Sequence, residues 1–207
     1  MIKKLTLAGL LLLLIGASPT FAQIDIKPGV SVGLNLASVR GDDAPDELDR
    51  RNGFRAGAIL MIDPVGPLAF QPEVLYQQKG YKSTIESGRQ EITSTYKINY
   101  AQINGLVKFQ VPLAGPVSPS FFAGPAIGFK VSESVERSGD TGTISFPDQD
   151  ASGTDVSAIL GLGMDISIGV TTLTVDARYG LGLTNLPEDG DTSIKNSTFG
   201  ISAGVLF

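Results

Sequence analysis

The chain has 207 residues, of which 42% are hydrophobic and only 18% charged, and its mean hydropathy is +0.16. This composition is too apolar for a disordered chain, and the length fits a single domain. Because the chain has no Cys and no His, it cannot form disulfides, zinc–thiolate sites, iron–sulfur clusters or histidine-dependent triads, and its net charge of −5 argues against nucleic-acid binding.

Residues 1–22 have the three parts of a secretory signal peptide. Lys3 and Lys4 form a basic start, an apolar run follows over 5–15, and a small residue, Ala22, precedes the expected cleavage before Gln23. The apolar run is short for a membrane-spanning helix, although an uncleaved anchor is the alternative. We therefore expect an exported mature domain over 23–207.

Alternation of apolar and polar residues runs through the mature chain and predicts strands rather than helices. The alternating segments lie near 30–37, 54–62, 70–79, 96–109, 121–131, 156–168, 172–181 and 199–207. Within 96–109 the phase reverses near Tyr100, which predicts a β-bulge there. Long polar connections, near 41–52, 83–94, 134–154 and 185–196, alternate with short ones near 63–68, 112–118 and 169–171. This order is typical of an up-and-down meander with two different ends.

The polarity of the two faces distinguishes two kinds of barrel. One face is almost purely apolar, with residues such as Leu34, Leu60, Leu162 and Val175, and the other is rich in Gly, Ser, Thr, Asn and Gln. Small residues suit the crowded interior of a narrow barrel, so we expect the apolar face to meet lipid. The prediction is an all-β fold, an eight-stranded antiparallel up-and-down transmembrane β-barrel in the outer membrane. A soluble periplasmic lipocalin-like carrier is the alternative.

Eight charged residues fall on the polar face and would share the lumen. They are Arg55, Glu73, Lys79, Lys108, Lys130, Asp165, Asp176 and Arg178. Because opposite charges buried together need partners, we predict a structural ion-pair network that plugs the lumen, with a narrow ion-conducting pore as the alternative.

Aromatic residues near the expected strand ends are candidates for the belts that mark a membrane interface. They are Phe70, Phe109, Phe121, Tyr179, Phe199 and Phe207. Ordinary packing is the alternative explanation for each of them.

Five segments carry a resemblance to a known family. They are GVSVGLN at 29–35, FQPEVLYQQKG at 70–80, NYAQI at 99–103, FAGPAIG at 122–128 and ARYGLGLTNL at 177–186. In this order they resemble the PorT-like outer membrane protein β-barrel domain family, also called porin family proteins. The resemblance implies an outer-membrane barrel, Phe207 as the terminal signal read by the barrel-assembly machinery, and an accessory role in secretion, but no common activity.

Fourteen of the 21 acidic residues lie in the long connections, which a periplasmic N-terminus would place at the cell surface. Exposure of these connections to water is a sufficient explanation for their acidic residues. The more specific alternative is that they bind divalent cations or an unknown protein partner. We predict no catalytic residue, metal site or cofactor. The expected role is structural, adhesive or accessory, with outer-membrane lipid as the surrounding partner.

Membrane fractionation separates the two kinds of barrel. We expect the protein to need detergent for extraction and to migrate differently on a gel before and after heating, because a closed membrane barrel resists unfolding by detergent. Recovery in the periplasmic extract would instead support the soluble carrier.

Overall fold

The computed structural model describes residues 24–42, 48–63, 66–87, 90–139, 142–147, 152–186 and 193–207. The proposed signal peptide, with Ala22 and Gln23, lies outside these ranges, so that assignment stays a prediction. Within the described ranges, no helix is long and apolar enough to cross a membrane. The strands are β1 (Asp25–Arg40), β2 (Leu48–Asp63), β3 (Leu68–Ser87), β4 (Gln90–Gln110), β5 (Val117–Gly139), β6 (Gly142–Pro147), β7 (Thr154–Ile168), β8 (Thr171–Gly182) and β9 (Lys195–Leu206).

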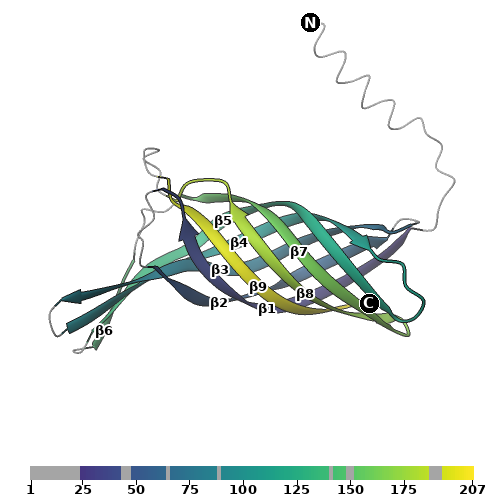
Figure 1. Ribbon diagram of the computed structural model, residues 1–207, viewed down its shortest axis with the longest axis horizontal. Helices are drawn as coiled ribbons and strands as arrows, with labels where there is room; N and C mark the ends of the chain where they lie inside the picture. The colour runs from purple at the N-terminus through teal and green to yellow at the C-terminus, as the bar shows by residue number, and fades with distance from the viewer. Residues whose placement is uncertain are drawn as a thin grey trace, which may run out of the picture.

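Eight of these strands close into an antiparallel barrel (Figure 1). The order is β1-β2-β3-β4-β5-β7-β8-β9, and closure comes from pairing of β1 with β9, for example Val32 with Ala203. This confirms the predicted eight-stranded barrel. Closure satisfies the backbone hydrogen bonds of every barrel strand, which an open sheet in lipid could not do.

A ninth strand, β6, was not predicted, and three connections expected as loops prove to be partly strands. The first is the connection near 41–52, because β2 already begins at Leu48. β3 and β4 stay paired as far as Ser87 and Gln90, and β5 continues past the barrel to pair with β6. The four strands form a ribbon that projects beyond one end of the barrel (Figure 1). The expected connections near 83–94 and 134–154 are therefore corrected to include hairpin strands. Their polar composition suited a loop, but cross-strand pairs such as Tyr81 stacked on Tyr96 stabilise a ladder.

The predicted phase reversal on β4 is wrong. Ile98 and Tyr100 are both buried, in phase with Gln102 farther along the strand. The irregularity lies on the neighbouring strand, because Asn99 pairs with Ser132 whereas Tyr100 pairs with Lys130. β5 thus carries the extra residue, and its two faces exchange at that point.

The apolar face points outward along the barrel. Leu34 is 72% exposed and Leu162 is 65% exposed, whereas Arg55 is 2% exposed and Arg178 is 6% exposed. An exposed apolar band around a polar interior is the inverted polarity of a membrane barrel. It contradicts the soluble lipocalin-like alternative, whose apolar side chains would fill the interior.

All six aromatic residues predicted for the belts are exposed on the outer surface, together with Phe54, Tyr76 and Phe129. Phe109 and Phe121 stack near the short turn between β4 and β5, with ring centroids 5.3 Å apart. Tyr179 and Phe199 are register partners nearer the opposite end, and Phe54 and Tyr76 are 5.6 Å apart. Aromatic residues therefore occur toward both ends of the apolar band, as membrane interfaces favour.

A charge in the middle of the outer face should be costly. Leu162→Arg places a cation against hydrocarbon, so we expect a loss of about 2–4 kcal/mol in the free energy of unfolding. This free energy is measured by urea titration in lipid vesicles, with the folded fraction read from the gel mobility of unheated samples. The matched control is Leu113→Arg in the turn after β4, where we expect a loss of no more than about 1 kcal/mol. Equal losses would contradict the membrane orientation.

An ion-paired lumen as the candidate functional site

Bulky side chains and glycines alternate around the lumen. One row of register partners runs through Phe122, Gly161, Arg178, Gly200, Asn35 and Gly53. A Cβ atom at Gly161 would collide with the ring of Phe122, so the glycine leaves room for that ring. The guanidinium of Arg178 then lies over the same ring, 5.1 Å from its centroid. The glycines of the polar face thus make space for large inward side chains in a narrow barrel.

The centre of the lumen holds a connected network around Arg178. Its guanidinium donates to Glu73 at 2.7 and 3.1 Å, and to Asp176 at 2.7 and 3.0 Å. Arg55 donates to Asp176 at 3.0 Å, so strands β2, β3 and β8 are joined through charged groups. Asn104 donates to Glu73 at 2.6 Å, and Ser202 donates to Asp176 at 2.6 Å. These carboxylates are paired and also hydrogen-bonded, which is what burial of charge requires.

Two further ion pairs flank this centre. Lys108 lies 2.8 Å from Asp165, on the side of the short turns. Lys79 lies 2.8 Å from Asp155, toward the projecting ribbon, and Asn196 also donates to Asp155 at 2.7 Å. Four cations are therefore matched by four anions among these paired lumen residues, so the network carries no net charge.

Seven of the eight charged residues predicted for the lumen lie together in this network. The exception is Lys130, which pairs at 2.8 Å with Glu133 at the level where β5 is bulged, and remains partly exposed. Sequence reasoning missed Asp155, the partner of Lys79, because the strand was expected to begin at residue 156. Asp155 lies two residues before Ser157, which is also buried, so the alternation of the strand was the signal that it faces the lumen.

Apolar clusters close the lumen on either side of the ion pairs. Ile59, Met61, Ala69 and Leu206 pack together at the end with the short turns. At the other end, Val39, Ile98 and Tyr100 pack with Leu186 from the connection between β8 and β9. The charged groups therefore lie between two layers of buried apolar side chains.

A cavity within the charged layer is very small. It is bordered by Arg55, Lys79, Gln102 and Arg178, among others, and its volume is about 20 Å³. That is room for about one water molecule. At this level the described inward side chains are buried and fill the lumen.

Comparison with known proteins agrees with this architecture. The model of the outer membrane protein beta-barrel domain family matches residues 8–207. The chain belongs to this family. Family membership and the barrel fold indicate an outer-membrane location. The family match does not distinguish PorT-like proteins from other members of the family. No curated protein matches the chain by sequence.

Solved structures include barrels of similar fold. Neisserial surface protein A (NspA) superimposes with a TM-score of 0.50 at 14% identity, covering 86% of this chain and 95% of NspA. Ail of Yersinia pestis gives a TM-score of 0.44 at 17% identity, covering 87% and 98% of the two chains. OprG of Pseudomonas aeruginosa gives 0.39 at 12% identity, covering 88% and 94%. At such identities NspA supports the fold alone.

Removing the central cation should destabilise the barrel. Arg178→Leu leaves Glu73 and Asp176 buried with fewer partners, so we expect unfolding to become easier by about 3–5 kcal/mol. Urea titration in vesicles measures the change. As a control, Lys97→Leu removes a half-exposed ion pair with Glu136, and we expect a change of no more than about 1 kcal/mol. Similar changes in the two variants would show that the lumen network is not a main source of stability.

Proposed function

We propose that this protein is a non-conducting outer-membrane barrel that acts through its cell-surface end, in adhesion or in attachment of a partner protein. The observation that carries the proposal is the filled lumen, with its paired charges and a cavity of only about 20 Å³. A barrel closed in this way has its functional surface outside the lumen. Short turns face the periplasm in such barrels, so the projecting ribbon faces the exterior.

The ribbon supports an interaction role because its two faces differ. Tyr81, Tyr96 and Val135 are register partners on one face. The next row, on the opposite face, brings Lys82, Thr95 and Glu136 into register. Ile92 and Ile144 are exposed on this extension, well beyond the barrel wall. Exposed apolar residues beside polar ones are a common feature of protein-binding surfaces.

An accessory role in secretion is a narrower version of this proposal and rests on the PorT-like resemblance. The acidic loops are further candidates for a protein or divalent-cation contact, although most of their acids lie outside the described residues. Surrounding lipid and the barrel-assembly machinery are the partners that any such barrel requires. A narrow ion-conducting pore is the competing function, and the filled lumen argues against it.

Conductance tests the closed lumen. We expect the purified protein, inserted in planar bilayers, to give no large, steady open currents, because the paired side chains occupy the ion path. A conducting porin inserted in the same bilayers serves as the positive control. Steady open currents from this protein would overturn the non-conducting proposal.

Shortening the ribbon tests the interaction role. Because Lys82 and Thr95 are register partners, residues 83–94 can be replaced by an Asn-Gly turn without shifting the barrel. We expect the variant to keep heat-modifiable gel mobility while cells that display it lose attachment to polystyrene. Unchanged attachment, with equal surface display, would contradict a role for the ribbon.

A further inference from the structure

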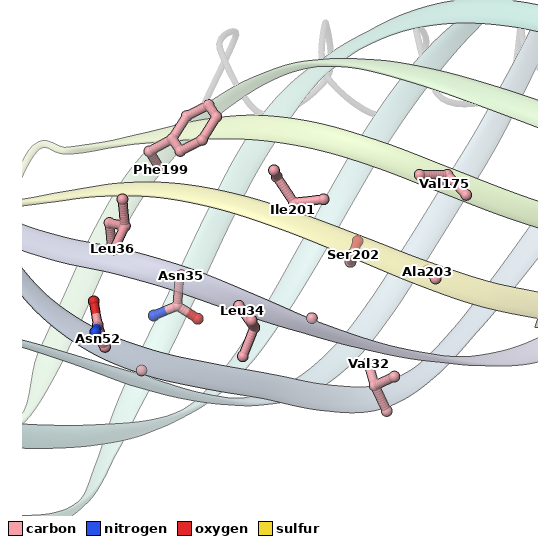
Figure 2. Close-up of a pocket in the computed structure, with 12 residues that line it drawn as sticks. Val32, Leu34, Asn35, Leu36, Asn52, Val175, Phe199, Ile201, Ser202 and Ala203 are labelled. Carbon is pink, nitrogen blue, oxygen red and sulfur yellow. The ribbon is translucent and has the colours of Figure 1, made fainter.

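An apolar groove runs along the outer face of the barrel where β9 meets β1 (Figure 2). Its volume is about 720 Å³. Ala203 is register partner to Val32 on one side and Val175 on the other, so a small side chain lies between two larger ones. Leu34 and Ile201, the next register pair toward the cell surface, also line the groove. Ala203, together with Gly33 and Gly53, therefore leaves space among longer side chains.

The groove lies on the membrane-facing surface, in the half nearer the cell exterior. Leu36 and Phe199 form its outermost register pair, and both are exposed. Phe199 pairs with Tyr179, one of the aromatic residues at that end of the apolar band. The groove thus lies at the depth of the outer leaflet, where acyl chains surround the barrel.

Polar groups continue the same outer face above the groove. Ser38 and Ser197 are the next outward register pair, and the hydroxyl groups of Ser197 and Tyr179 are 2.7 Å apart. Arg40 and Lys195 form the pair beyond them. Since outward residues recur every second position, the column changes from apolar to hydroxyl to cationic within four residues, or about 13 Å.

The two cations at the top of this column remain available to an anion. Within the described residues, neither Arg40 nor Lys195 has a carboxylate within ion-pair distance, although Asp42 is exposed nearby. Arg40 donates to the carbonyl of Gly182 at 2.9 Å, which uses one of its five N–H groups. Phosphate is a strong acceptor for the remaining donors.

We infer that this column is a binding site for one molecule of lipid A, the phosphorylated glycolipid of the outer leaflet. An acyl chain fills the groove beside Ala203, the sugar hydroxyls lie at Ser38 and Ser197, and a phosphate lies between Arg40 and Lys195. The order of groups along the barrel matches the order of groups along the lipid. A second copy of this chain fits less well, because a symmetric contact through the groove would bring the cations of both copies together.

Filling the groove tests the apolar half of the site. We expect Ala203→Phe to lower binding of lipid A about tenfold, measured by native mass spectrometry of the mature protein in detergent, because the ring takes the space of the acyl chain. The matched control is Ala58→Phe, an exposed position on β2 that does not line the groove, and it should bind as the wild type does. Equal binding by the two variants would overturn the acyl site.

Removing a cation tests the polar half. We expect Lys195→Gln to weaken binding of lipid A about tenfold, but to leave binding of lipid A without phosphate unchanged. Lys82→Gln, at the same end of the barrel but on β3, is the control and should bind normally. Heat-modifiable mobility of each variant shows that it is folded. Equal binding of phosphatidylglycerol and lipid A would overturn the assignment to lipid A, and no effect of Lys195→Gln would overturn the phosphate contact.

Discussion

The structure depends on neutralising charge inside a barrel that is barely wide enough for its own side chains. Arg178 meets this constraint by binding Glu73 and Asp176 together, and Arg55 extends the same network to β2. A guanidinium suits this position because its planar array of donors can satisfy two carboxylates at once. Glycines across the lumen provide the space, as Gly161 does beneath Phe122. Charge pairing and close packing therefore both follow from the narrowness of the lumen.

Alternation in the sequence was sufficient to sort most barrel side chains into two faces, with Lys130 as an exception and Asp155 left out. A strand turns successive residues to opposite faces, which separates Arg55, Glu73 and Asp176 from Leu34 and Leu162. The small residues on the polar face then indicated that this face lies inside. Partner choice was not predictable in the same way, because it depends on register between strands that are distant in sequence. Lys79 and Asp155, for example, are 76 residues apart and meet only when the barrel closes.

The irregular parts of the fold were harder to predict for a different reason. Tyr100 is aromatic and faces inward, so it broke the expected polarity of β4 and suggested a bulge on the wrong strand. The polarity of a residue indicates the environment of its side chain, not the face of the barrel on which it lies. Near the mouth of the lumen the inward face is itself apolar, because Tyr100 packs there with Val39 and Leu186. β6 was missed because a short, polar-flanked segment is stable as a strand only through its pairing with β5.

The extra residue on β5 separates two parts of that strand. Below it, even-numbered positions such as Phe122 and Ala126 point into the lumen, and above it Val135, an odd-numbered position, is buried. The projecting half can therefore keep its own pattern of inward and outward side chains without imposing that pattern on the membrane-spanning half. Substitutions in the ribbon can therefore change its exposed side chains without changing which side chains of β5 face the ion-paired interior.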